Sequence, residues 1–331
     1  MSPVVSRPSG RRALRAAAAG VVALGLLLWW LLPLGEAPPS GRTTLSTGTK
    51  AGVYQKYGKL LKEKLDEDMP DLDVRLLTSA GSQENVKRVA LGQAGFAIAA
   101  ADAVETYRLS GREGAGALRG VARLYDDYVQ LVVAPDSDIH SVSDLKGRRV
   151  SIGPPGSGVR LIADRVLRAA GIDSEKDISP EADGIDTGPK RLGKSIDAFF
   201  WSGGLPTDGV NALAERSALR FVPIEDDLVA KLHRQGGATR YYRARNIPDS
   251  AYAVIPTGTS VPTIAVSNVL ITRADLDPRL VEWVTRTVLQ SRDVIGESVH
   301  SAQLVDLRTA IYTDPLTLHK GARRYYRSVK P

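Results

Sequence analysis

The chain has 331 residues, of which 43% are hydrophobic and 24% are charged, and its formal net charge is +7. It contains no cysteine, which excludes disulfide bonds, thiolate catalysis, cysteine metal ligands and a lipid attached through an N-terminal cysteine. Lys and Arg form no block of the kind that binds nucleic acid, so we expect no such partner.

The N-terminal segment has the layout of an export signal. Residues 1–15 are basic and contain no acid, and residues 16–34 carry no charge. This apolar run is close to the roughly 20 residues that a helix needs to cross a bilayer, and no clear Ala-x-Ala cleavage site follows it. We therefore expect a retained membrane anchor with its basic end in the cytoplasm, and a cleaved signal peptide is the alternative. Residues 35–42 form a short tether.

Beyond the tether, short apolar or β-branched runs alternate with segments of helical periodicity. This alternation predicts a parallel α/β architecture. In the first half the expected strands are 43–47, 72–77 and 96–100, and the expected helices are 54–67 and 85–91. These elements form an expected first lobe, and a further strand at 127–134 leads out of it. In the second half the expected strands are 149–152, 198–201, 219–223 and 262–270, the last returning to the first lobe, and the expected helices are 160–170 and 278–299.

Three of these strands end in loops of small residues that open a helix, at 47–49, 79–82 and 153–158. Each loop exposes backbone N–H groups at a helix N-terminus, where the helix dipole favours negative charge, and Gly lets a ligand approach the backbone. One such loop is usually only a turn with an N-cap. Three of them on two lobes predict a carboxylate-bearing ligand in a cleft at the carboxyl ends of the strands.

Motifs of the common enzyme and cofactor classes are absent from the sequence. The loop at 153–158 lacks the Gly-Lys-Ser/Thr ending of a P-loop and the spacing of a dinucleotide-binding fingerprint. No Gly-x-Ser-x-Gly elbow, His-x-x-x-His pair or acidic metal cluster occurs. We therefore expect no enzymatic activity, no cofactor and no metal.

Aromatic residues beside the loops are candidates for packing the body of a ligand. They are Tyr54, Trp201 and Tyr252, and for each of them structural packing is the alternative. The segment 197–204 joins an Asp, a buried strand, a Trp, a Ser and two Gly. This segment fits the mouth of a cleft and a simple strand-turn equally well.

As an ordered set, several segments resemble the TAXI-type solute-binding proteins of tripartite ATP-independent periplasmic (TRAP) transporters. The matching segments are STGTKAGVYQKYG (46–58), TSAGSQENVKRVALGQAGFAIAAAD (78–102), ARLYDDYVQLVV (122–133), SVSDLKGRRVSIGPPGSG (141–158), IDAFFWSGGLP (196–206) and VPTIAV (261–266). Each motif is loose when taken alone. Their shared order, over most of residues 43–267, makes the resemblance specific.

The resemblance implies a type II periplasmic-binding-protein fold, in which two α/β lobes joined by crossing strands close on a small carboxylate or amino acid. The loaded protein then docks on a membrane permease. We expect a first lobe of residues 43–129 and 265–331 and a second lobe of residues 130–264. The residues expected to face the ligand are Thr47, Gly48, Thr49, Tyr54, Gly81, Ser82, Asn85, Asp102, Gly156, Ser157, Gly158, Trp201, Ser202 and Gly203.

A second hypothesis uses the same fold differently. A membrane-anchored sensor or scaffold outside the cell would bind a partner protein instead of feeding a permease. It predicts a retained N-terminal segment and recovery of a receptor or cell-wall partner from membranes. The sequence does not separate these two hypotheses.

Overall fold

The computed structural model describes residues 14–15, 17–23, 37–216 and 219–329, which belong to two units, Met1–Pro38 and Pro39–Pro331. In the first unit, residues 14–15 and 17–23 are helical. Most of the membrane helix expected over 16–34 lies outside the described residues. Within the described part of the chain, no helix is both long and apolar enough to cross a bilayer.

Parallel strands alternate with helices in the first part of the second unit, as the sequence predicts. β1 (Gly41–Ser46) pairs in parallel with both β2 (Leu72–Leu77) and β3 (Phe96–Ala100). The helices that follow these strands are α2 (Val53–Asp68), α3 (Ser82–Ala90) and α4 (Ala101–Leu109). The helix expected at 85–91 begins three residues earlier because Gly81, with a φ of 135°, turns the chain directly into α3.

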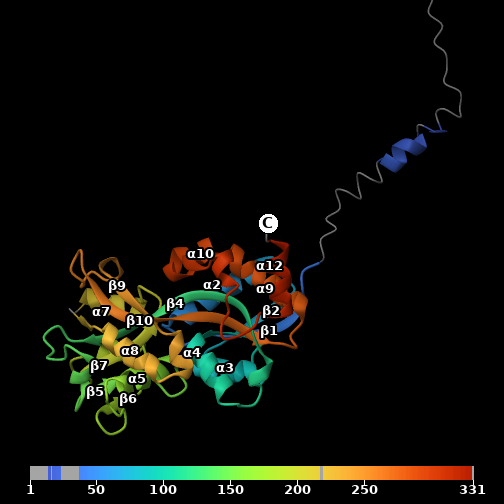
Figure 1. Ribbon diagram of the computed structural model, residues 1–331. Helices are drawn as coiled ribbons and strands as arrows, with labels where there is room; N and C mark the ends of the chain where they lie inside the picture. Colours follow the sequence, from blue (N-terminus) through green and yellow to red (C-terminus); the bar gives the residue numbers. More distant parts are fainter. Residues whose placement is uncertain (1–13, 16, 24–36, 217–218, 330–331) are drawn as a thin grey trace, which may run out of the picture. The chain divides into compact units, whose positions relative to one another are not determined.

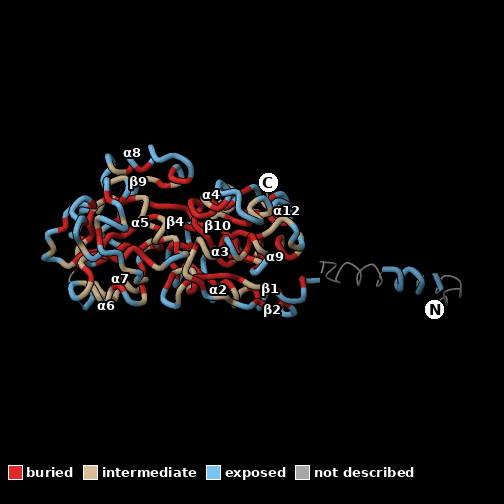
Figure 2. Tube along the Cα trace, turned by 90° about the horizontal axis from the view of Figure 1, so that it is seen from below, coloured by how far each residue is buried: buried red, intermediate tan, exposed pale blue. Residues whose placement is uncertain are grey.

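Alternate residues of β3 face two different layers of helices. Phe96 and Ile98 belong to a hydrophobic cluster that includes α2 and C-terminal helices, whereas Ala97 and Ala99 belong to a cluster that includes α3 and α4. Successive side chains of a strand point to opposite faces of its sheet. Helices therefore cover both faces, and the strands run through the buried interior, drawn red in Figure 2.

Two long strands connect this region with the rest of the unit. β4 (Leu118–Val133) and β10 (Ser260–Arg273) pair antiparallel, with an irregularity between Ser267 and Val269. In Figure 1 they run between one group that contains β1, β2, α3 and α9 (Pro278–Gln290) and another that contains β5 (Arg149–Ser151), β7 (Ala198–Gly203) and α5 (Gly158–Ala169). We call the first group, together with β3, α2, α4 and α12, lobe 1. We call the second group, together with β6 and the helices α6, α7 and α8, lobe 2. The predicted boundaries at residues 129/130 and 264/265 fall inside these strands and stay predictions.

Lobe 2 contains a second parallel sheet region with its own hydrophobic cluster. β5 (Arg149–Ser151) pairs in parallel with β6 (Ser179–Glu181) and β7 (Ala198–Gly203). β7 and β8 (Arg220–Val222) pair antiparallel with β4, and β9 (Arg243–Pro248) pairs antiparallel with β10. The helices are α5 (Gly158–Ala169), α6 (Gly188–Arg191), α7 (Asp208–Arg216) and α8 (Asp226–Arg234).

The C-terminal region returns to lobe 1. Its helices are α9 (Pro278–Gln290), α10 (Arg292–Ser298), α11 (Leu307–Ala310) and α12 (Lys320–Ser328). The single helix expected over 278–299 is therefore two helices that meet at Ser291, whose hydroxyl donates to Thr287 O at 2.6 Å. Short 3₁₀ turns are η1 (Ala115–Ala117), η2 (Val142–Leu145), η3 (Gly237–Tyr241), η4 (Asp249–Ala251) and η5 (His300–Leu304).

Candidate functional site

A pocket lies between the loops that follow β1, β2 and β5 and the last residues of β7. Its empty volume is about 580 Å³, including space open to solvent. Residues from segments 48–54, 80–82, 154–162 and 201–203 line it, together with Ala100, Asp127 and Gly184. The predicted site residues that line the pocket are Gly48, Thr49, Tyr54, Gly81, Ser82, Ser157, Gly158, Trp201, Ser202 and Gly203. Three of the lining segments are the small-residue loops noted in the sequence.

Three helices begin at this pocket. α2 and α3 have Gly52 and Gly81 as N-caps, which supply no side-chain cap, and the N-cap of α5 is Ser157, whose Oγ accepts from Arg160 N at 3.0 Å. The first N–H groups of a helix have no partner within the helix, and the dipole makes this end partly positive. Among the described residues, no Arg, Lys or His lines the pocket. The backbone is therefore the main source of positive potential there.

The hydroxyl of Thr49 adds a polar group to the same wall. Thr49 Oγ1 is buried and has no hydrogen-bond partner among the described residues. A buried hydroxyl without a partner is costly, and a ligand group that bonds to it removes that cost. This makes Thr49 a candidate contact for an anionic ligand.

The N-termini of α3 and α5 approach each other closely. Glu84 N donates to Gly156 O at 3.0 Å, and Gln83 Nε2 donates to Ser157 O at 2.7 Å. A Cβ at Gly81 would lie 3.3 Å from Gly158 N. Glycine at Gly81 thus permits both the positive φ and the contact between the lobes at one edge of the pocket. Gly156 belongs to this contact and does not line the pocket.

Tyr54 reaches from α2 to the crossing strand β10. Its hydroxyl donates to Asn268 Oδ1 and lies 3.0 Å from Ser82 Oγ, which accepts from Ala100 N at 3.1 Å. Burial raises the pKa of Tyr54 well above its usual value, and the nearby charge of Asp127 adds to this rise. The tyrosine therefore stays protonated and ties α2, α3 and β10 together beside the pocket.

Asp127 is a functional candidate that the sequence reasoning missed. It lies in β4, is 3% exposed and lines the pocket, and its Oδ1 has no hydrogen-bond partner among the described residues. Burial raises the pKa of Asp127 to about 7, although Asn268 and Tyr54 favour its charged form. In the sequence, the one indication of this role is that Asp127 is an acidic residue in a mostly apolar segment. An acidic residue at that position also fits the end of an ordinary strand.

Trp201 and Tyr252 have different roles. Trp201 lines the pocket, and its Nε1 donates to Thr207 Oγ1 at 3.1 Å. Tyr252 is not among the lining residues; its hydroxyl donates to Gln130 Oε1 at 2.8 Å and accepts from Thr207 N at 2.7 Å. Trp201 thus presents an aromatic surface to the pocket, whereas Tyr252 is structural packing.

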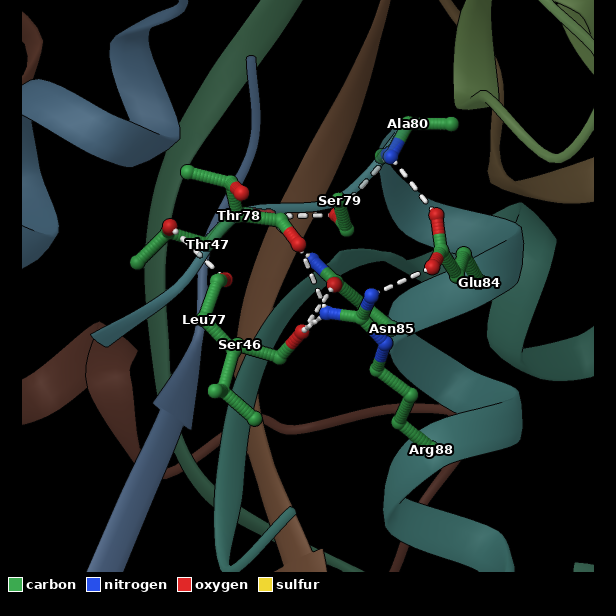
Figure 3. Close-up of polar contacts among 10 residues, drawn as sticks. Ser46, Thr47, Leu77, Thr78, Ser79, Ala80, Glu84, Asn85 and Arg88 are labelled. Carbon is green, nitrogen blue, oxygen red and sulfur yellow. Dashed lines mark hydrogen bonds and ion pairs between the residues drawn. The ribbon is translucent and has the colours of Figure 1, made fainter. Parts of the chain in front are cut away.

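Asn85 and Thr47 lie behind the pocket wall and do not line it. Figure 3 shows Asn85 pointing from α3 towards Ser46 and Thr47. Asn85 Oδ1 accepts from Ser46 Oγ at 2.6 Å, and Nδ2 donates to Thr47 O at 2.6 Å and to Ile98 O at 2.8 Å. The amide is thereby committed to joining α3 with β1 and β3, and Thr47 Oγ1 contacts Gln55 Oε1.

Asp102 also lies outside the pocket lining, in a contact between the two lobes. Its Oδ2 accepts from Arg165 Nη1 at 3.1 Å and from the Tyr242 hydroxyl at 2.7 Å. Arg165 Nη2 donates to Thr106 Oγ1 at 2.6 Å. Burial raises the pKa of Asp102, and Arg165 and Tyr242 oppose that rise. These side chains join α4 of lobe 1 to α5 and to Tyr242, which directly precedes β9.

The sequence profile of the NMT1-like family matches residues 45–329. A protein of Bordetella bronchiseptica RB50 is 18% identical, with 88% of this chain and 90% of that chain covered and a TM-score of 0.51. A candidate L-cystine ABC transporter protein of Listeria monocytogenes is 14% identical, with 80% and 98% covered and a TM-score of 0.50. The alkanesulfonate-binding protein SsuA of Xanthomonas axonopodis pv. citri, bound to MOPS, is 16% identical, with 89% and 86% covered and a TM-score of 0.49.

The likenesses to the Bordetella and Listeria structures concern the fold. They confirm the expected two-lobed α/β periplasmic-binding-protein fold. At these identities, nothing about the ligand follows from them.

Proposed function

The chain belongs to the NMT1-like family, and from this premise we propose that it is an extracytoplasmic solute-binding protein for a small carboxylate or amino acid. The solute binds between the lobes, and the loaded protein delivers it to a membrane permease. The resemblance of the sequence to TAXI proteins favours a permease of the TRAP type. The basic and apolar N-terminal segment favours export and retention at the membrane.

One observation carries the proposal: the N-termini of α2, α3 and α5, from both lobes, converge on one pocket, and no basic side chain is among its described lining residues. Backbone N–H groups at helix N-termini bind anions without a charged side chain. The hydroxyl of Thr49, which lacks a partner, supports the same assignment. The anionic group of the solute would occupy this end of the pocket.

The remaining pocket wall suits the body of a small solute. Tyr54 and Trp201 supply aromatic surface, and Val159 and Ile162 supply aliphatic surface. Ligand sites usually combine such apolar walls with a few polar groups that fix orientation. Because the wall includes residues of both lobes, a bound solute would stabilise the closed arrangement over an open one.

Isothermal titration of the purified chain tests this function. The panel contains dicarboxylates, α-amino acids and short alkanesulfonates, and mass spectrometry identifies any solute that co-purifies. We expect saturable binding of at least one carboxylate or amino acid with one site per chain. If no compound of the panel gives a heat of binding and no solute co-purifies, the proposal is wrong.

A pull-down from membranes tests the delivery step. Recovery of an integral-membrane permease that depends on the bound solute is the expected result. Recovery of a receptor or cell-wall protein, regardless of solute, would instead favour the sensor hypothesis. The experiment uses the full chain because the N-terminal segment is part of the prediction.

A further inference from the structure

Asp127 is a buried acidic group to which the pocket gives no positive partner. Of the lining residues that the structure describes, it is the one acidic side chain, and none of them is Arg, Lys or His. Its Oδ1 has no hydrogen-bond partner in the described part of the chain. A buried carboxyl oxygen without a partner carries a free-energy penalty unless something else bonds to it.

Asp126, the residue before Asp127 on β4, is a carboxylate whose charge is balanced by two arginines. Asp126 Oδ1 accepts from Arg123 Nη2 at 2.7 Å and from Arg243 Nη2 at 3.1 Å. Successive side chains of β4 point to opposite faces of the sheet. Arg123 and Arg243 therefore bind Asp126 on one face of the sheet, whereas Asp127 points to the other face and lines the pocket.

The side chains that affect the pKa of Asp127 are all neutral or acidic. They are Asn268 of β10, Tyr54 of α2, Asp126 of β4 and Asp102 of α4, and Tyr125 of β4 also lies close enough for its own pKa to respond to Asp127. Tyr54 already donates its hydroxyl proton to Asn268 Oδ1. None of these groups supplies the positive charge that a buried carboxylate requires.

The pocket wall thus carries two kinds of polar group. Helix N-termini and the Thr49 hydroxyl favour an anion, whereas the carboxyl group of Asp127 favours a cation. We propose that Asp127 binds the ammonium group of the solute, so that the natural ligand carries both an anionic group and an amine. This inference rests on the proposed function and narrows its ligand class to zwitterions.

The alternative is a protonated Asp127 that donates to an anionic group of the ligand. The two cases differ in the sign of the proton exchange. The free site has a carboxyl whose pKa is about 7, so near pH 7 it is about half protonated. An ammonium group lowers this pKa and expels roughly half a proton on binding, whereas an anionic group raises it and takes up roughly half a proton.

Matched ligand pairs test the proposal on the full chain. The pairs are L-glutamate with glutarate, L-alanine with propionate, and taurine with ethanesulfonate, each titrated near pH 7 in phosphate and in Tris to count protons. We expect the amine to improve affinity by roughly tenfold or more in at least one pair, with release of protons. The Asp127→Asn variant should lose both the preference and the proton release.

Asp126→Asn is the matched control, because it removes the same charge from the adjacent residue on the opposite face. It should keep the preference for the amine, and its proton release should become smaller but persist, because the charge of Asp126 contributes to the raised pKa of Asp127. Equal affinity within every pair that binds, proton uptake, or an unchanged preference in Asp127→Asn would overturn this inference and leave the proposed function standing. If neither these compounds nor the wider panel bind and no solute co-purifies, the proposed function fails and this inference fails with it.

Discussion

Hydrogen bonding separates Asn85, which lies behind the pocket wall, from Thr49 and Asp127, which line the pocket. Asn85 bonds through both ends of its amide to β1 and β3, so nothing of it remains for a solute. Thr49 Oγ1 and Asp127 Oδ1 are buried without partners and belong to pocket-lining residues. Buried polar groups are nearly always bonded, so a bound solute is the natural partner for both.

Replacement of Thr49 by Ala removes a hydroxyl that bonds to nothing in the described structure. The expected loss is therefore in binding: the dissociation constant of an anionic solute rises roughly tenfold, the equivalent of one hydrogen bond to a charged group. The melting temperature should stay within about 2 °C of the parent chain, since no internal bond is lost. Titration calorimetry and thermal unfolding measure the two quantities.

Thr259→Ala provides the control for this change, because Thr259 is exposed in a loop and outside the pocket. It should leave affinity unchanged. A large drop in stability of Thr49→Ala, with unaltered affinity, would assign Thr49 a structural role.

Replacement of Asp127 by Asn should stabilise the ligand-free protein at high pH. Burial raises the pKa of this carboxyl from 3.8 to about 7, so the folded state holds the proton more tightly than the unfolded state. The contribution of the carboxyl to stability is full below about pH 4 and is lost as pH rises through about 7. We expect Asp127→Asn to exceed the parent in unfolding free energy by on the order of 1–4 kcal/mol at pH 8.

The difference between these two chains should disappear near pH 4. Urea unfolding at several pH values measures it, with the ligand removed beforehand. A gap of the same size at pH 4 and pH 8 would show that the side chain acts by packing and not by titration.

Sequence reasoning found most residues of the pocket wall because they share a local signal. Small residues at a strand end before a helix, such as Gly81 and Ser82, can be read within a few positions. Asp127 gives no such signal, since its burial depends on the pairing of β4 with β10 and on Tyr54 from α2. The structural roles of Asn85 and Asp102 depend on distant partners in the same way.

At the scale of elements, the contact between α3 and α5 determines the shape of the site. The two helices meet through Glu84 N and Gly156 O and through a close approach of Gly81 to Gly158. Replacement of Gly81 by Ala would place a Cβ 3.3 Å from Gly158 N and force a residue with a side chain to a φ of 135°. We expect this variant to fold but to lose affinity by roughly tenfold or more, because the helix N-termini separate.

Gly92→Ala controls for backbone strain in the same helix. Gly92 follows the other end of α3 with a φ of 72° and has nothing within 4 Å of an added Cβ. Both variants should lose some stability, and only Gly81→Ala should lose affinity. Equal affinities would show that the pocket tolerates a shift of α3 relative to α5.

The sequence predicted the type of most elements better than their extent. β2 and β3 occupy the expected residues, but the strand expected at 127–134 is the last part of β4, which begins at Leu118. The residues before 127 include Arg119, Gly120 and Arg123, which interrupt the apolar alternation of a strand. Pairing with β10 along both lobes keeps these residues extended. Such tertiary pairing has no local signature.

At the scale of the whole binding unit, β4 and β10 provide the covalent connection between the lobes, and side-chain contacts fasten them. The buried pair of Asp102 and Arg165, bridged by the Tyr242 hydroxyl, lies away from the pocket. If the lobes close on a solute as proposed, this cluster forms part of the closed state. Affinity then depends on residues that never touch the ligand, because they change the population of the closed state.

Replacement of Tyr242 by Phe tests this dependence. The variant loses the hydroxyl bonds to Asp102 Oδ2 and Arg165 Nη1 but keeps the ring and the ion pair. We expect the closed state to lose about 1–3 kcal/mol, so that the dissociation constant of the solute rises and the radius of gyration of the ligand-free protein increases. Calorimetry and small-angle scattering measure these effects, and Tyr312→Phe, at an exposed tyrosine, is the control. A lower melting temperature with unchanged affinity and radius would mean that the cluster stabilises the lobes without governing their closure.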